Sequence, residues 1–191
     1  RNGDSKVLAE ALYNSFREQG LTVWLDIKMS KLNEAAMEEG VRNCSCVIAI
    51  LSGADASDPN AYFNREFCVK ELNWSQNAGV PIQPVCAVGD KSNIGSFIGQ
   101  ATSKGIQNLG DIDIIHLDRS RPTYWEAGVK DVTNAVKEQA EAAANKRAAA
   151  RLAANKRADA AAAQEASNAG YGVGSPVRVL FGAVEYVGKV I

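Results

Sequence analysis

A run of six consecutive apolar residues, 46–51, constrains the fold of this chain more than any other feature. Its sequence, Cys-Val-Ile-Ala-Ile-Leu, gives a strand no side that could face water, so both of its faces must be covered. Further strand candidates lie at 21–25, 81–88 and 112–117, and segments with helical spacing alternate with them. Strands that alternate with helices in this way predict a parallel sheet with helices on both faces, which is an α/β fold.

Helical periodicity predicts the helices between these strands. The first runs from Asp4 or Ser5, either of which can cap it, to about Gln19, and Gly20 stops it. Further helices are predicted at 34–43, at 64–75 with an end near Gly79, weakly at 94–101, and from about Thr123, where Pro122 fits the first turn.

Composition limits the classes of function. A chain of 191 residues with 46% hydrophobic and 23% charged side chains can build one ordinary core and an appendage. Its net charge of −1 gives no electrostatic case for binding nucleic acid or an anionic membrane. No run is long and apolar enough to span a bilayer, and no signal peptide opens the sequence, which begins at Arg1.

The sequence contains four cysteines: Cys44, Cys46, Cys68 and Cys86. Most of them lie in or beside apolar runs, where thiols are expected to be buried and reduced, which indicates an intracellular, cytoplasmic protein. The first two are separated by a single residue, which is too close for a usual zinc pair, and His116 is the only histidine. We therefore expect no metal site, and we expect a structural role for His116.

The character of the chain changes after about residue 136. Alanine dominates residues 140–169, and the segment Ala-Ala-Asn-Lys-Arg-Ala occurs twice, at 143–148 and 153–158. Alanine at this density favours a helix, although Leu152 is the only large apolar residue that could serve a coiled-coil seam. A long solvated helical spacer is predicted, with partial disorder as the alternative. Its basic residues are offset by acidic ones, so it is not interpreted as a nucleic-acid arm.

The last residues predict a separate small element. After a glycine-rich stretch, residues 177–181 and 185–191 read as two strands joined by a turn. They are similar to the opening of a small SH3-like or Tudor-like β-barrel, and a loose hairpin is the alternative. The sequence thus divides into a domain at 1–136, a helical spacer at 137–169 and the start of a β module at 170–191.

The helix predicted at 64–75 carries an unusual pattern. Cys68 and Leu72 share one stripe, which is ordinary core, while Phe67, Glu71 and Trp74 share another. A carboxylate between two aromatic rings is typical either of a shaped pocket or of a rim glutamate beside two half-buried rings.

Topology bears on this choice. Ligands of parallel sheets bind beyond the carboxyl ends of the strands, where residues 26–33 and 52–61 form loops. The second loop leads directly into the helix that carries Glu71, so we expect Glu71 to line a cleft there.

Residues 1–136 resemble a TIR (Toll/interleukin-1 receptor) domain. Four segments carry the resemblance in the right order. They are the Arg-Asn-Gly-Asp-Ser-Lys segment at 1–6, Gly-Leu-Thr-Val-Trp-Leu-Asp at 20–26, the strand and serine at 46–52, and Phe-Cys-Val-Lys-Glu-Leu at 67–72, which is similar to a Trp-Cys-x-x-Glu-Leu motif. The resemblance implies a flavodoxin-like fold with five parallel strands, of which the first normally precedes the position of Arg1 and is expected to be missing here. Residues 89–110 match poorly.

Catalytic members of this family cleave NAD between nicotinamide and ribose, giving ADP-ribose or a cyclic variant. The essential glutamate of the family maps onto Glu71. A lone carboxylate suits this chemistry, because nicotinamide leaves from a ring that is already positively charged and needs no general acid. The resemblance thus implies NAD as a substrate and no bound cofactor.

The resemblance also implies roles for other residues. Phe67 would wall the pocket, Trp24 and Asp26 would belong to a mobile loop that gates the site or joins protomers, and Arg1 would meet a phosphate. Each has a plain structural alternative: packing for Phe67, a buried core position for Trp24, the start of a turn for Asp26, and a loose terminus for Arg1.

Two functions therefore compete. One is an NAD-consuming enzyme of signalling and innate immunity that acts when TIR domains self-associate. The other is a non-enzymatic TIR–TIR assembly module. Another flavodoxin-like domain, such as a nucleoside deoxyribosyltransferase or a receiver domain, ranks lower, because Asp26 alone does not make the acidic Mg²⁺ cluster of a receiver.

Overall fold

The computed structural model describes residues 3–25, 33–53, 55, 57–168, 176–181 and 184–189. The chain divides into two compact units, Arg1–Ala144 and Asn145–Ile191, and the division falls inside one helix, α5 (Pro122–Asn168).

A three-stranded parallel sheet forms the centre of the first unit. Its strands are β1 (Val47–Leu51), β2 (Ile82–Ala87) and β3 (Ile115–Leu117), in that order across the sheet. Val47 pairs with Ile82, and Val85 pairs with Ile115. The predicted α/β fold with a parallel sheet, consistent with a flavodoxin-like architecture, is thus confirmed.

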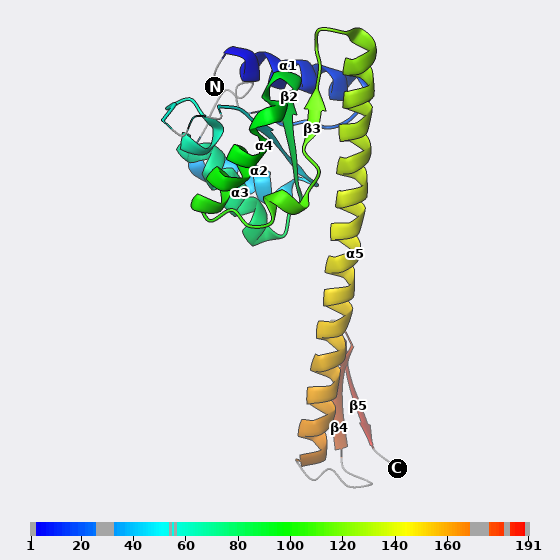
Figure 1. Ribbon diagram of the computed structural model, residues 1–191. Coiled ribbons are helices and arrows are strands. Elements are labelled where there is room, and N and C mark those ends of the chain that lie inside the picture. The colour runs from blue at the N-terminus through cyan, green and yellow to red at the C-terminus, as the bar shows by residue number, and fades with distance from the viewer. Residues whose placement is uncertain are drawn as a thin grey trace. The chain divides into compact units, whose positions relative to one another are not determined.

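One face of the sheet is covered by α3 (Glu66–Ala78) and α4 (Ile94–Ser103), as Figure 1 shows. Phe63 and Phe97 are 1% and 0% exposed in the core on this side, where Leu51 and Leu72 are also buried. Each such side chain contributes roughly 1.5–3 kcal/mol through removal from water. Short 3₁₀ helices lie in the connections of the described chain: η2 (Tyr62–Asn64), η3 (Val88–Asn93) and η4 (Leu109–Asp111).

The other face is covered by α1 (Gly3–Glu18) and the first turns of α5. Its core contains Leu12 and Phe16 of α1, Val85 of β2 and Val132 of α5. α5 begins at Pro122, as the sequence predicts. Gly128 lets this helix approach the sheet closely, because a Cβ there would lie 2.8 Å from the side chain of Leu117.

The helix α2 (Glu34–Asn43) packs beside α3. Asn33 caps it, since its side-chain oxygen accepts a hydrogen bond of 2.8 Å from the backbone N–H of Ala36. Met37 and Val41 form its buried stripe.

Two predicted strands differ from the structure. Residues 21–25 do not form a strand, because no strand of the described chain pairs with them; Leu21 and Val23 still pack against the core. The strand predicted at 112–117 shortens to β3. Pro84 in the central strand has no N–H, and the register between β2 and β3 begins one residue later, at Val85.

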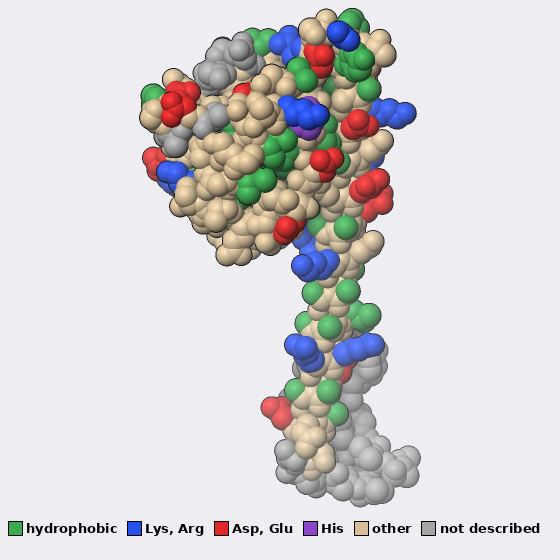
Figure 2. Space-filling view, viewed as in Figure 1, with side chains coloured by type: hydrophobic (Ala, Val, Ile, Leu, Met, Phe, Trp, Pro, Cys, Tyr) green, Lys and Arg blue, Asp and Glu red, His purple; other side chains and the backbone are tan. Residues whose placement is uncertain are grey.

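In the second unit α5 continues to Asn168, and every side chain from 145 to 165 is exposed. Lys and Arg side chains stand out from this stretch in Figure 2. The predicted pair of terminal strands is confirmed as an antiparallel hairpin of β4 (Pro176–Phe181) and β5 (Val184–Lys189). The likeness to an SH3 or Tudor barrel stays a prediction. Within the described residues, no helix is both long enough and apolar enough to cross a membrane.

Candidate functional site

The two ends of the loop between β1 and α3 are held together at the carboxyl end of the sheet. The N–H of Tyr62 donates a hydrogen bond of 2.9 Å to the backbone oxygen of Ser52. Gly53 follows with φ +76°, and a Cβ there would lie 2.5 Å from the Cα of Ala61. Only glycine allows both this positive φ and this close approach, so the contact fixes where α3 begins relative to β1.

The stripe of α3 that was predicted to be core is confirmed, and the second stripe is more exposed. Cys68 and Leu72 are 6% and 0% exposed. Phe67, one turn before Glu71, is 44% exposed, and Glu71 and Trp74 are half-buried. The helix ends as predicted at Gly79, which has the left-handed conformation (φ 62°).

The positively charged side chain of Lys70 lies beside this more exposed stripe, which we call the outer stripe. Nζ of Lys70 is 2.7 Å from Oε1 of Glu66, 2.9 Å from Oε1 of Glu34 and 5.2 Å from the ring centroid of Phe67. Hydrogen bonds to Glu66 and then Glu34 raise the pKa of Lys70, and the pKa of Glu66 is lowered by Lys70. The contact with Glu34 joins the first turn of α2 to α3, and it places a positive charge beside the exposed ring.

The predicted binding residues are only partly described. Trp24 is 39% exposed and lies over α2 at Gly40, where a Cβ would come within 3.7 Å of its indole ring. The alternative that Trp24 is a buried core residue is therefore wrong, because the segment that carries Trp24 is not a strand of the sheet. Arg1 and Asp26 lie outside the described residues, so their roles stay predictions.

A pocket of about 220 Å³ lies at the carboxyl ends of β1 and β2. This is where a parallel sheet is expected to bind a ligand. The sequence predicted a ligand site at the loop that begins with Ser52, but it did not predict that Ser5 and Asp90 also line the pocket. The lining residues are Ser5, Leu8, Ile50, Leu51, Ser52, Ala87, Gly89 and Asp90. Neither Glu71 nor Phe67 nor Trp24 is among them.

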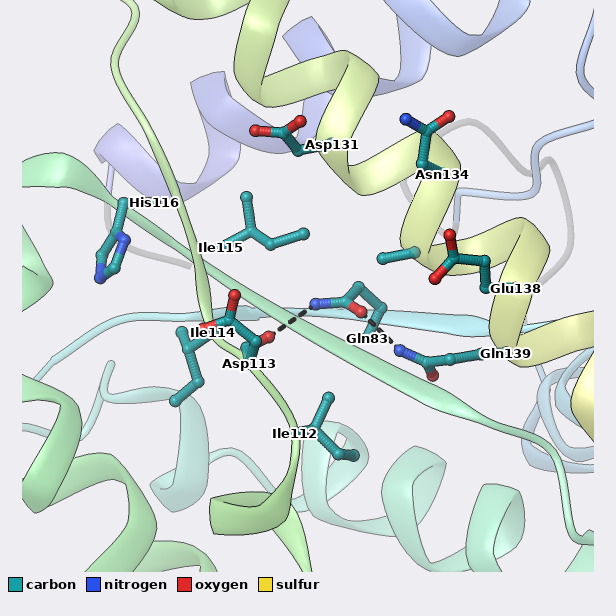
Figure 3. Close-up of a pocket in the computed structure, with 11 residues that line it drawn as sticks. Gln83, Ile112, Asp113, Ile114, Ile115, His116, Asp131, Asn134, Glu138 and Gln139 are labelled. Atoms are coloured by element: carbon teal, nitrogen blue, oxygen red, sulfur yellow. Dashed lines mark hydrogen bonds between the residues drawn. The ribbon is translucent and has the colours of Figure 1, made fainter.

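A second hollow, of about 530 Å³, runs along β3 and the first part of α5 (Figure 3). Sequence reasoning missed it, because its walls come from segments far apart in the chain. His116 borders it, and the Nε2 atom of His116 is buried with no hydrogen-bond partner among the described residues.

Two of the four cysteines, Cys46 and Cys86, are poor candidates for a nucleophile in this fold. Burial raises the pKa of Cys46 to about 12 and that of Cys86 to about 11, so both thiols keep their protons at neutral pH. No disulfide forms among the four cysteines in the described structure. In the part of the chain that the structure describes, no group of three or more His, Cys, Asp or Glu side chains could hold a metal ion.

Comparison with known proteins identifies the family. The profile described as "TIR domain" matches residues 2–100, which is more than half of the 191 residues. The chain therefore belongs to the TIR domain family, which confirms the resemblance drawn from the sequence.

Among solved structures, the chain is similar to the TIR domains in the structure of the activated Roq1 resistosome directly recognizing the pathogen effector XopQ. The identity is 17% and the TM-score 0.40, over 70% of this chain and 80% of that chain. No curated protein gives a significant match.

Proposed function

We propose that this TIR domain is a signalling enzyme that cleaves NAD between nicotinamide and ribose when copies of it associate. The observation that carries the proposal is the placement of Glu71. It lies half-buried on α3, one turn after the exposed ring of Phe67, within the aromatic-Cys-x-x-Glu-Leu pattern.

The chemistry required of the protein is small. Cleavage of the bond between ribose and nicotinamide leaves positive charge on the sugar, and a carboxylate facing that charge stabilises it more than it stabilises the substrate. Glu71 supplies this carboxylate and accepts hydrogen bonds from the ribose hydroxyls. The nicotinamide leaves as a neutral ring with the bonding electron pair, so it needs no proton from the protein, and water completes the reaction at the ribose.

The neighbouring residues would hold the substrate. Phe67 offers an exposed ring face against which a flat base or ribose can pack. Trp24 and Asp26 would belong to a loop that closes on the site, and Arg1 would pair with a phosphate of NAD. Association of copies would complete the site, since this stripe of α3 is open to solvent.

Assembly without catalysis is the second candidate function. It is favoured by one observation: Glu71 lines neither the pocket at the carboxyl ends of β1 and β2 nor the hollow along β3. In that case the exposed stripe of α3 would serve only for contact between TIR domains.

The test is release of nicotinamide from NAD by the purified 191-residue chain at high concentration, with and without a crowding agent, followed by chromatography. Glu71→Gln is compared with Glu39→Gln, which changes an exposed glutamate on α2. We expect Glu71→Gln to abolish nicotinamide release and Glu39→Gln to preserve it, with both variants folded by circular dichroism. A folded, self-associating protein that leaves NAD intact would favour the assembly module.

A further inference from the structure

We propose that the outer edge of β3 binds an extended peptide rich in lysine and arginine, which adds to the sheet as a further strand. The proposal concerns a surface apart from Glu71, and it holds whether or not the protein cleaves NAD.

The first step is the open edge of the sheet. β3 is the last strand in the order β1-β2-β3, and of the described strands only β2 pairs with it. Alternate N–H and C=O groups of an edge strand point away from its neighbour, and in the described chain no strand meets those of β3. Figure 3 looks onto this edge, where the chain of β3 crosses in front of β2. Such an edge is a template for an added strand.

The second step is the shape of the surface beside that edge. The hollow of about 530 Å³ follows residues 112–116 on one side and the first part of α5 on the other. Ile112 and Ile115 line it and offer apolar contacts. Alternate side chains of an added strand would therefore meet apolar surface, while its backbone completes the sheet.

The hollow also carries negative charge. Asp113 precedes β3, and Asp131 and Glu138 project from α5, and these three exposed carboxylates line the hollow. Among the residues that the structure describes, no lysine or arginine lines it. In Figure 2, several acidic side chains are spread over this side of the domain, and a Lys or Arg side chain lies against the histidine. Complementarity therefore favours a basic peptide and disfavours an acidic one.

The spacing of the carboxylates fits an extended chain. Asp131 and Glu138 lie two helical turns apart, which is about 10 Å along the helix axis. An extended peptide covers that distance in about three residues. Basic side chains at alternate positions share one face of such a peptide and start about 7 Å apart, and their flexible stems can make up the remaining distance to both carboxylates of α5.

Hydrogen bonds hold this surface in shape before anything binds. Nε2 of Gln83, on β2, donates to the backbone oxygen of Asp113 at 2.9 Å, and Nε2 of Gln139 donates to Oε1 of Gln83 at 2.6 Å. One buried side chain thus connects the two walls of the hollow. A preformed surface loses less conformational entropy on binding.

The experiment measures binding of a fluorescein-labelled Lys-Val-Lys-Val-Lys-Val peptide to the full chain by fluorescence anisotropy. An acidic peptide, Glu-Val-Glu-Val-Glu-Val, serves as the charge control. The double variant Asp131→Lys/Glu138→Lys removes two carboxylates of the hollow. Its matched control, Glu126→Lys/Glu141→Lys, makes the same change of net charge at exposed positions of α5 that do not line the hollow.

We expect saturable binding of the basic peptide that weakens with added salt, and no binding of the acidic one. Asp131→Lys/Glu138→Lys should weaken binding by roughly tenfold or more, and the control pair by less than about twofold. Two further peptides carry N-methyl groups at alternate residues, in the two opposite phases. One phase should weaken binding by about tenfold, because it removes the N–H groups that pair with β3.

Three results would overturn the proposal. The first is no binding, or equal weakening by both charge variants. The second is equal binding of both N-methylated peptides and the parent peptide, which would reduce the effect to side-chain charge. The third is self-association that depends on Asp131 and Glu138 without peptide binding, which would assign the surface to a second copy of the chain.

Discussion

The side-chain amide of Gln139 on α5 donates a hydrogen bond of 2.6 Å to Oε1 of Gln83 on β2. Gln83 is 1% exposed, and its own amide donates to the backbone oxygens of Pro84 and Asp113, at 2.9 Å each. A buried glutamine is costly unless its polar atoms are paired, and here the donor and the acceptor both have partners. This one side chain connects the central strand to the segment before β3 and to α5.

The first prediction concerns this pair. Gln139→Ala removes the donor and leaves Oε1 of Gln83 buried without it, so we expect the free energy of unfolding to fall by about 1–3 kcal/mol. Urea denaturation measures the loss. Asn134→Ala, five positions earlier on α5 and exposed, is the control and should change stability by less than about 0.5 kcal/mol. Equal stabilities of the two variants would mean that water replaces the Gln139 amide.

The second prediction separates two costs of replacing glycine. Gly20 and Gly53 have nearly the same backbone angle, φ +78° and +76°, but only Gly53 lies against backbone, at Ala61. Gly20→Ala should destabilise the protein by roughly 1 kcal/mol, the cost of a left-handed residue with a Cβ. Gly53→Ala should lower the free energy of unfolding clearly more, because its Cβ would also collide with Ala61, whose backbone must then move. Thermal unfolding of both variants decides this, and equal losses would contradict the close approach.

The sequence predicted most of the fold because the signals are local. The run at 46–51 needs cover on both faces whatever surrounds it, and the spacing of Cys68 and Leu72 fixes the buried side of α3. The length of β3 was not predictable, because it depends on pairing with a strand that contains Pro84.

The candidate site, like the fold, was only partly predictable from the sequence. The position of Glu71 on the outer stripe of a helix follows from periodicity. The two hollows do not, because each is made by segments that meet only in the folded chain. Gln83 and Gln139 are separated by 56 positions, and nothing in either local sequence announces their contact.

The third prediction concerns alkaline pH. Burial, and then the nearby Cys44, raise the pKa of Cys46 from 9.0 to about 12, against a smaller lowering by a backbone hydrogen bond at Gln83. In the unfolded chain this thiol loses its proton near pH 9, whereas the folded chain keeps it to about pH 12. The unfolded state therefore binds fewer protons in this window, and stability falls as the pH rises from about 9 to 12.

Cys46→Ala should flatten that dependence. We expect the unfolding free energy, measured with urea between pH 8 and 11 under reducing conditions, to fall less steeply in Cys46→Ala than in the unsubstituted chain. The difference in slope is at most about 1.4 kcal/mol per pH unit for a single group. Parallel curves would show that Cys46 ionises in the folded protein as it does in the unfolded one.

The last prediction contrasts two phenylalanines four positions apart. Phe63 is 1% exposed in the core of the sheet, and Phe67 is 44% exposed on α3. Phe63→Ala should destabilise the protein by about 3–5 kcal/mol, since it leaves a cavity among well-packed neighbours. Phe67→Ala removes a ring that is largely in water, so its effect on the unfolding free energy should be within about 0.5 kcal/mol.

For nicotinamide release we expect Phe67→Ala, which has the smaller effect on stability, to have the larger specific effect. If the exposed ring of Phe67 holds the substrate beside Glu71, Phe67→Ala lowers nicotinamide release by roughly tenfold or more while the protein stays folded, whereas Phe67→Tyr, which keeps a ring face, retains most of it. Urea denaturation and nicotinamide release measured on the same samples separate the two effects. A Phe67→Ala protein that loses several kcal/mol of stability would place this ring in the core, and one with unchanged turnover would remove it from the site.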